Sequence, residues 1–421
     1  MKSKSLVFVL LITIFPSLVK AQENTTNERI EAKIDSIMNW AIENEAFPGS
    51  QLLAIHKNDL IFHKTYGFHT YDSLVPVHKN DIYDLASVTK ILGPLLGIMK
   101  LYEEGEIDLD EPFSSYWTSW RGKKDKTKIT LRELLAHQAG MEPYIVFLNE
   151  VLKKGKFKSR FIRSEKKGRF SKQAAAGLYV NKRFENKVFR FIKRSKVKEE
   201  KKYLYSGLGS LIYPKLIADL SGIPYEEYLR KNFYDPIGCG QLGYNPVSKG
   251  WKQLVPTEVD TLFRKTLVKG WVHDENAALL GGISGNAGLF GTATDVAKLM
   301  QMLINKGAYN GRRYLKESTV NEFIRIQYPE NDNRRGLGFD KPLIGNDTLS
   351  IKECYPAPEV SPSSFGHAGF TGTFVWADPE YDLVFVFLSN RVYPSRSHRN
   401  IYNLNIRPKL QQVFYQELFQ K

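Results

Sequence analysis

The sequence predicts an α/β (α+β) fold in which an antiparallel sheet is flanked by helices and closed by both ends of the chain. Two stretches of strand character support this, Gln51 to Tyr66 near one end and Gly372 to Leu388 near the other. Helical periodicity dominates between them, so we expect a mostly helical domain inserted into the sheet domain. The 421 residues, of which 42% are hydrophobic, suffice for one large core or two domains.

The expected division of the chain has four parts. Residues 1–21 form a leader, residues 22–86 and 291–421 form the α/β sheet domain, and residues 87–290 form the mostly helical domain, which includes a basic insertion at 152–202.

The N-terminus has the order of a secretory leader. Lys2 and Lys4 precede an apolar run from Leu6 to Phe15, and the small residue Ala21 follows. We expect cleavage after Ala21 and a periplasmic or secreted protein. No cysteine lies near that junction, which argues against a lipid anchor, and no later stretch reaches the length of a membrane-spanning helix.

The first elements after the leader are a helix and a hairpin. Apolar residues recur with helical spacing from Asn27 to Glu43, and Phe47-Pro48-Gly49 ends that helix. Two strands are then expected on either side of the turn at His56 to Asp59.

The next element is a helix expected to begin near Ser87. Ser87 and Lys90 are three residues apart, which places both side chains on one helical face. The unpaired N–H groups of the first turn favour an alkoxide over an ammonium. Burial of Lys90 would favour its neutral amine, which can take the Ser87 proton. Pro94 then removes an N–H from the helix and predicts a local distortion.

The Ser-x-x-Lys spacing is weak by itself because it occurs four times, at Ser17, Ser87, Ser164 and Ser195. Only Ser87 precedes a long apolar helix that can bury the lysine.

Further helices are expected across the middle of the chain, followed by strands. Thr130 and Glu133 form a predicted capping box for a helix ending at His137, whose expected role is to brace the following turn. Other helices are expected over the ranges 208–220, 225–233, 294–305 (capped by Thr294-Asp295) and 400–420. The strands expected at 372–377 and 383–388 are joined by a turn at Asp378 to Tyr381.

Cysteine and histidine usage indicates no metal or cofactor. The eight histidines are scattered, with no Cys-x-x-Cys and no His-Glu-x-x-His. Cys239 and Cys354 are compatible with one bridge or with two buried thiols.

The net charge of +15 belongs to one segment. Leu152 to Lys202 holds twenty Lys and Arg against four acidic residues, a balance of +16, so the rest of the chain is nearly neutral. One interpretation is a solvated, partly helical insertion. The other is a contact with an anionic surface such as cell-wall polymer or lipid head groups. A leader argues against nucleic acid as a partner.

Three motifs in order resemble the β-lactamase-related serine hydrolases, the superfamily of class C β-lactamases, low-molecular-mass penicillin-binding proteins and related esterases. They are Ser87-Val88-Thr89-Lys90, Tyr205-Ser206-Gly207 and His367-Ala368-Gly369. The stretches 134–140, 272–277 and 287–290 are also similar, and the resemblance runs from about Ile30 to Val392. It implies the β-lactamase/transpeptidase-like fold.

The resemblance also implies residue roles. Ser87 would be the acylated nucleophile, Lys90 the general base or its relay, and Tyr205 the proton shuttle to the leaving group. His367 stands where many relatives have lysine, and it could hydrogen-bond a substrate carboxylate or Tyr205. The backbone N–H groups of Ser87 and Phe370 would bind the oxyanion.

Four residues are expected to contact substrate: Gly207, His273, Gly369 and Thr371. His273, with Asp274 and Glu275, either lines the cleft or pins a loop. Gly207 departs from the Asn or Asp of many relatives, and a buried hydrogen bond of that kind is worth about 1–3 kcal/mol.

These observations predict a secreted serine hydrolase acting through an acyl-enzyme on amide or ester bonds, with a cell-wall peptide (as in DD-peptidases) or a small ester as substrate. A β-lactamase is the alternative within the class, and Gly207 and His367 argue against it. A catalytically weak penicillin-binding or sensing protein is the alternative from another class. The sequence leaves the substrate and the oligomeric state open.

Overall fold

The computed structural model describes residues 25–419 and has one five-stranded antiparallel sheet built from both ends of the chain. Its strand order is β15 (Phe365–Ala368), β16 (Phe374–Asp378), β17 (Leu383–Ser389), β1 (Gly49–His56), β2 (Asp59–Gly67). The central pair is β1 with β17, in which Leu53 lies opposite Val386. Segments more than three hundred residues apart therefore close the sheet, as predicted.

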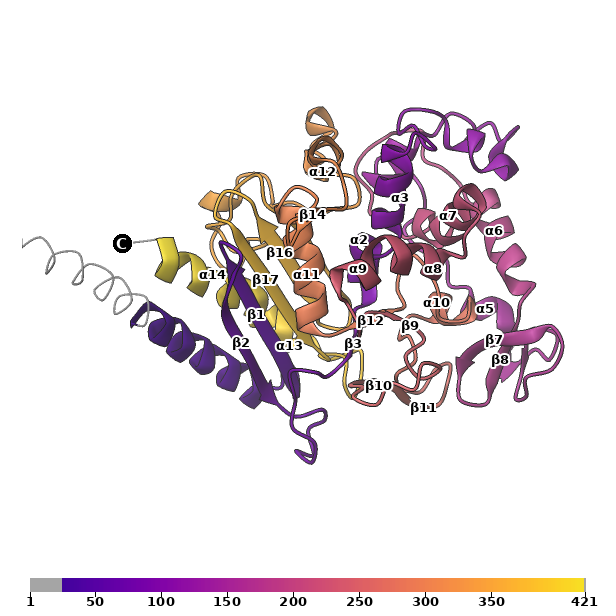
Figure 1. The fold of residues 1–421 in the computed structure, drawn as a ribbon. Coiled ribbons are helices and arrows are strands. Elements are labelled where there is room, and N and C mark those ends of the chain that lie inside the picture. The colour runs from indigo at the N-terminus through magenta and orange to yellow at the C-terminus, as the bar shows by residue number, and fades with distance from the viewer. Residues whose placement is uncertain (1–24, 420–421) are drawn as a thin grey trace, which may run out of the picture.

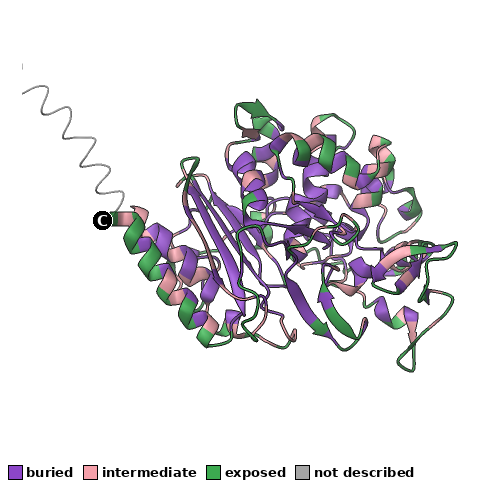
Figure 2. Cartoon of the chain, turned by 60° about the horizontal axis from the view of Figure 1, so that its bottom comes forward, coloured by how far each residue is buried: buried purple, intermediate pink, exposed green. Residues whose placement is uncertain are grey.

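Helices cover both faces of this sheet (Figure 1). Alternate side chains of β17 point to opposite faces. Phe385 and Phe387 pack with the helix over residues 25–43 and with α14 (Ile406–Phe419), while Val384 and Val386 belong to the core on the face that α11 (Ala293–Ile304) covers. Figure 2 shows the sheet strands as buried and the outer face of the flanking helices as exposed.

The helix-rich part lies beside the sheet and is joined to it through a small second sheet, β3 (Tyr83–Asp84), β12 (Leu289–Gly291) and β9 (Gly243–Tyr244). Its helices are α2 (Thr89–Leu92), α3 (Pro94–Glu103), α4 (Leu131–Leu135), α5 (Leu148–Val151), α6 (Phe184–Arg194), α7 (Tyr213–Ser221), α8 (Tyr225–Leu229), α9 (Asp235–Ile237) and α10 (Glu275–Leu279), with a π-helical turn at Arg230–Tyr234 after α8. Further elements are α12 (Glu317–Ile324), α13 (Asn400–Asn403) and the hairpins β10 (Pro256–Asp260) with β11 (Thr266–Lys269) and β13 (Ala308–Tyr309) with β14 (Arg312–Arg313).

Local chemistry sets several element boundaries. The capping box predicted for Thr130 and Glu133 is present at the start of α4. The cap of α11 is Thr292 rather than Thr294-Asp295, because the Thr292 hydroxyl accepts from the Asp295 N–H. The C-terminal helix predicted as continuous is broken into α13 and α14, with Asn405 at positive φ between them.

The basic insertion, residues 152–202, contains both helix and strand. It holds one long helix, α6, and five short strands: β4 (Leu152–Lys153), β5 (Lys156–Phe157), β6 (Ile162–Arg163), β7 (Phe170–Ala175) and β8 (Leu178–Asn181). Apolar residues alternate with its charges, so Val180, Phe184 and Ile192 are buried in the main core. The segment is thus half core and half surface.

Several absences apply to residues 25–419 alone. No helix there is long and apolar enough to cross a bilayer, and no cluster of His, Cys, Asp and Glu there could hold a metal ion. Cys239 and Cys354 are both buried free thiols, which decides between the two alternatives left by the sequence. The predicted leader, residues 1–21, lies outside the described residues.

Candidate active site

Ser87 lies between β3 of the small sheet and α2, the first helix of the helix-rich part. A 3₁₀ turn, η1 (Ala86–Val88), precedes α2, so Ser87 stands just before the helix rather than inside it. The helix is interrupted at Gly93, and α3 starts at Pro94. This interruption is the local distortion that Pro94 predicts. Ser87 is half-buried and Lys90 is 8% exposed.

The loop between β15 and β16, residues 369–373, holds the segment just before Ser87 against the five-stranded sheet. The Thr371 hydroxyl donates to the Asp84 carbonyl at 2.8 Å, and the Thr373 hydroxyl donates to the Leu85 carbonyl at 3.0 Å. A Cβ at Gly369 would lie 2.7 Å from the Leu85 oxygen, so only glycine permits this approach. Phe370 is thereby held beside the Ser87 turn.

The Ser87–Lys90 pair has the predicted geometry. Lys90 Nζ donates to Ser87 Oγ at 2.9 Å and to the backbone carbonyl of Asn286 at 2.9 Å. Tyr205 completes the group, since Lys90 Nζ lies 5.6 Å from the centre of its ring. The Ser87 hydroxyl, the Lys90 amine and the Tyr205 ring therefore lie close together, although Ser87 and Tyr205 are 118 positions apart in the sequence.

His367 lies near Tyr205, with ring centres 6.3 Å apart. Its Nδ1 is 2.7 Å from the Ala368 carbonyl, and its Nε2 is buried without a hydrogen-bond partner among the described residues. Burial, and then the positive charges of Arg335 and Lys90, lower the pKa of His367 to about 3. His367 is therefore a neutral imidazole at physiological pH.

The two predicted oxyanion donors have free N–H groups. Within residues 25–419, neither the Ser87 N–H nor the Phe370 N–H donates a hydrogen bond. The Phe370 side chain is 47% exposed. Arg391 contacts this residue twice: its Nε donates to the Phe370 carbonyl at 2.7 Å, and its guanidinium lies 4.2 Å from the centre of the Phe370 ring. Free donors beside a half-buried hydroxyl can stabilise an oxyanion.

The four predicted substrate contacts differ in their surroundings. Gly207 faces open space, because an added Cβ would meet nothing closer than the Pro143 carbonyl at 4.0 Å. Gly369 is needed for packing, and the Thr371 side chain is fully committed to Asp84. His273 donates its backbone N–H to Asp84, bonds Glu258 through Nε2 at 2.8 Å and stacks on Phe370 at 5.7 Å. Thr371 and His273 thus both stabilise the site through hydrogen bonds to Asp84.

The acidic residues next to His273 also pin the loop. Asp274 caps α10 by accepting from the Ala277 N–H, and Glu275 pairs with Arg396 at 2.8 Å. Arg396 pairs with Glu258 as well. Although burial opposes it, hydrogen bonds from His273 and Arg396 lower the pKa of Glu258 to about 2.

Two groups beside Tyr205 were not singled out as site residues by the sequence. Arg335 is 1% exposed, lies 5.7 Å from the centre of the Tyr205 ring and pairs with Asp340 at 3.0 Å. His137, predicted to brace a turn, lies 4.5 Å from the Tyr205 ring and accepts from the Ser206 N–H at 3.3 Å. Burial of the His137 ring, and after it the positive charges of Arg335 and Lys90, lower the pKa of His137 well below its usual value.

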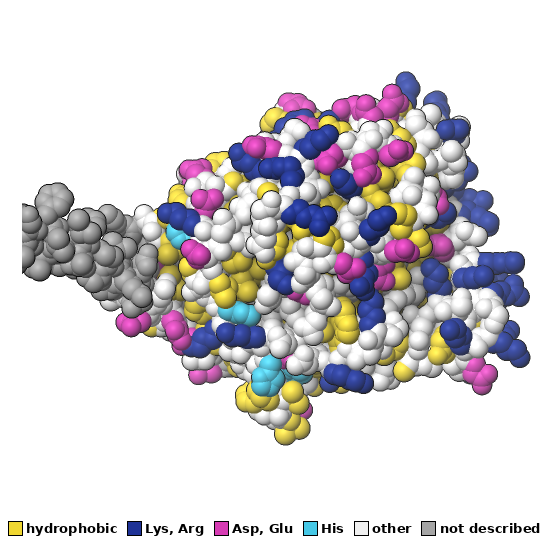
Figure 3. All heavy atoms as spheres, in the orientation of Figure 1, with side chains coloured by type: hydrophobic (Ala, Val, Ile, Leu, Met, Phe, Trp, Pro, Cys, Tyr) yellow, Lys and Arg dark blue, Asp and Glu magenta, His cyan; other side chains and the backbone are white. Residues whose placement is uncertain are grey.

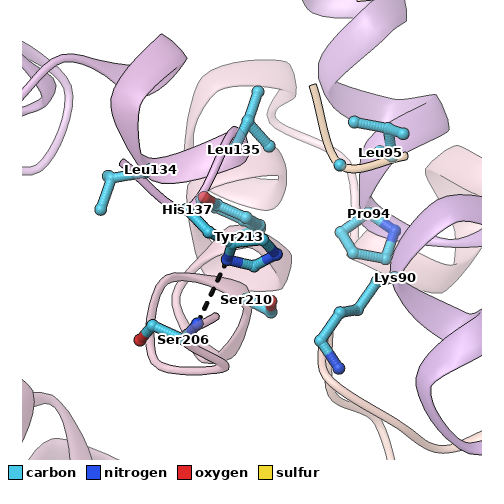
Figure 4. Close-up of a pocket in the computed structure, with 10 residues that line it drawn as sticks. Lys90, Pro94, Leu95, Leu134, Leu135, His137, Ser206, Ser210 and Tyr213 are labelled. Carbon is cyan, nitrogen blue, oxygen red and sulfur yellow. Dashed lines mark hydrogen bonds between the residues drawn. The ribbon is translucent and has the colours of Figure 1, made fainter. Parts of the chain in front are cut away.

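A cavity of about 20 Å³ lies beside Lys90. Figure 4 shows the His137 ring across from Lys90, with the Ser206 backbone N–H bonded to it and the Ser206 hydroxyl pointing away from Lys90. Leu134, Leu135, Leu95 and Tyr213 complete most of the cavity wall. A cavity of this size holds about one water molecule. Arg335 carried no sequence signal because no local pattern marks it, and Asn286 acts through its carbonyl, for which any residue type would serve.

The chain is similar to known proteins over most of its length. A family model described as Beta-lactamase matches residues 28–406. A relative from Salmonella heidelberg, named "Putative D-alanyl-D-alanine carboxypeptidase", is 28% identical over 408 residues, covering 90% of this chain and 86% of its own. One from Escherichia coli O157:H7 with the same name is 27% identical over 406 residues, with the same coverage.

Solved structures share the fold. A penicillin-binding protein homologue from Caulobacter crescentus has a TM-score of 0.65 at 16% identity, covering 93% of this chain and 98% of its own. A class C beta lactamase from Rhodobacter sphaeroides has 0.61 at 15% identity, with coverages of 90% and 98%. EstCE1, a hydrolase with promiscuous acyltransferase activity, has 0.64 at 15% identity, with coverages of 91% and 99%.

Proposed function

The chain belongs to the Beta-lactamase family and is a serine hydrolase, and from that premise we propose that it acts through an acyl-enzyme on Ser87, with peptides ending in D-alanyl-D-alanine as substrates. The observation that carries the proposal is the 2.9 Å hydrogen bond between Lys90 Nζ and Ser87 Oγ, with Tyr205 beside it. The relatives named as carboxypeptidases support the substrate class.

In acylation, Ser87 Oγ attacks the carbonyl carbon of the scissile amide, and its proton passes to the Lys90–Tyr205 pair. The carbonyl oxygen becomes an oxyanion between the N–H groups of Ser87 and Phe370. Tyr205 then delivers the proton to the leaving amine as the C–N bond breaks, which leaves an ester on Ser87.

In deacylation, a water molecule attacks the ester carbonyl and gives its proton to the same pair. The Ser87–acyl bond breaks, and the proton returns to Ser87 Oγ. His367 takes no proton in either step, because its pKa of about 3 keeps it neutral. Its Nδ1 faces the Ala368 carbonyl, which leaves the buried Nε2, without a partner among the described residues, free to accept a hydrogen bond.

A small ester is a second candidate substrate, and the neutral His367 favours it. A terminal carboxylate binds best to a permanent cation, and Arg335 near this site is already paired with Asp340. An ester without a carboxylate needs only the nucleophile and the oxyanion donors.

The test is labelling with a fluorescent fluorophosphonate, followed by turnover of a D-alanyl-D-alanine peptide, p-nitrophenyl butyrate and nitrocefin. We expect Ser87-dependent labelling, and a loss in kcat of about 10²–10⁴-fold for Tyr205→Phe, the size of a lost general acid–base group. Ser87→Ala is the control and should abolish both labelling and turnover. Labelling that persists in Ser87→Ala would refute the assignment of the nucleophile.

We also propose that the protein works outside the cytoplasm. The order of charged, apolar and small residues over 1–21 supports export. N-terminal sequencing of the protein from a periplasmic or culture fraction should start at Gln22, and an intact Met1 in the cytosolic fraction alone would contradict export.

A further inference from the structure

A strongly cationic groove lies between α6, the turn at η3 (Thr118–Trp120) and the start of α7. It has a volume of about 510 Å³. None of the residues that line it is acidic, and five are cationic: Lys123, Arg190, Lys193, Arg194 and Lys215. Figure 3 shows Lys and Arg side chains gathered on the edge of the molecule that carries α6 in Figure 1.

Most of these cations lack an acidic partner. Lys215 pairs with Asp219 at 2.7 Å, but the other four form no ion pair with any residue in 25–419. Elsewhere on α6 the charges are paired, since Lys187 bonds Glu150 at 2.8 Å. The groove therefore concentrates uncompensated positive charge, whereas the adjoining surface of the same helix neutralises it.

Helix geometry makes this arrangement unfavourable in the absence of an anion. Residues 190, 193 and 194 are related by i,i+3 and i,i+4 spacing and so share one face of α6. Like charges at these spacings repel one another, and a bound anion removes that repulsion.

The groove also has an aromatic wall. The rings of Trp117 and Phe189 meet edge to face at 5.1 Å, and both line the groove. The apolar side of α6 is buried, with Phe184, Val188 and Ile192 in the core. Phe189 and Phe191 are partly buried, so α6 lacks the continuous exposed apolar face with which a helix enters a lipid bilayer, whereas a concave groove with an aromatic wall fits a polymer chain.

We propose that this groove binds an anionic polysaccharide, whose carboxylate or phosphate groups pair with the unpartnered Lys and Arg side chains. The site is separate from the catalytic one, because none of its residues lines the cavity beside Lys90. This proposal does not depend on the substrate assigned to the catalytic site. It assigns the anionic contact expected of the basic insertion to one face of α6.

Point variants test the groove, because deleting 152–202 would remove buried core residues such as Val180 and Phe184. Binding of the full chain to polygalacturonate and to poly(glycerol phosphate) would be measured by biolayer interferometry at low salt, with neutral dextran as the reference. The two polymers separate carboxylate from phosphate as the recognised group.

We expect Arg190→Gln with Arg194→Gln to weaken binding of at least one polymer about tenfold, and salt to weaken wild-type binding. The matched control is Lys166→Gln with Lys167→Gln, which removes the same charge from an exposed turn of the same segment and should change affinity less than about twofold. Fluorophosphonate labelling of Ser87 should be unchanged in both variants, as a check on folding.

Equal losses in the two double variants would overturn the proposal, because binding would then follow total charge and not the groove. Binding to dextran as tight as to the polyanions would also overturn it. Binding to phosphatidylglycerol vesicles without binding to either polymer would do the same and would assign this face to a membrane.

Discussion

His367 is the residue through which the electrostatics of the site can be tested. The structure buries its ring beside two cations, Arg335 and Lys90, and lowers its pKa from 6.5 to about 3. The folded protein therefore keeps His367 neutral over a pH range in which the unfolded chain protonates it. We consider the substitution His367→Gln, which removes the titrating group.

The sign and size of the effect follow from linkage between protonation and folding. Above pH 6.5 the imidazole is neutral in both states, so His367 has no effect on the pH dependence there. As the pH falls from 6.5 toward 3, the unfolded chain gains a proton that the folded protein does not, and stability is lost. At pH 5 the loss is about 2 kcal/mol, from 1.36 kcal/mol for each pH unit.

The assay is urea denaturation of the wild type and of His367→Gln at pH 7.5 and pH 5. The packing cost of the substitution is the same at both pH values and cancels. His63, whose pKa burial lowers to about 4, contributes in the same direction in both proteins and also cancels. We expect the variant to lose about 2 kcal/mol less than the wild type between the two pH values.

The matched control is His78→Gln, because His78 is exposed and its ring stays hydrated on folding. It should leave the pH dependence unchanged. If His367→Gln and the wild type lose stability equally between pH 7.5 and pH 5, His367 is not held neutral, and the argument that the site lacks an imidazolium fails.

Three further substitutions test the packing around the site. Gly369→Ala should cost about 1–3 kcal/mol by thermal denaturation, because the new Cβ would lie 2.7 Å from the Leu85 carbonyl; a Tm equal to that of the wild type would contradict the close approach. Gly207→Ala should change stability by less than about 0.5 kcal/mol, because the site faces open space, and a large loss of Tm would show that this space is filled. Thr130→Ala should cost about 1 kcal/mol through loss of the capping box; urea denaturation measures it, and no change would mean that the cap is redundant.

Much of the fold could be predicted because local pattern and local structure agree. The hairpin of β1 and β2 follows from period-two alternation around a polar turn, and the start of α4 follows from its capping box. The predicted cap of α11 was wrong because Thr292 and Thr294 are both possible cap residues. Tertiary contacts select Thr292: Gln51 accepts from the Ala293 N–H, and Asp295 accepts from the Gln241 N–H.

The sequence alone determined the family of this protein and the groups available to its site: a serine and a lysine three residues apart, a tyrosine and a strand with His367 and Gly369, in one order along the chain. Only the tertiary structure decided how these groups act on one another. Burial beside Arg335 makes His367 neutral, and a backbone carbonyl at Asn286 holds Lys90. The physical reason is that electrostatic environment and backbone contacts arise between segments distant in sequence, where residue type carries little information.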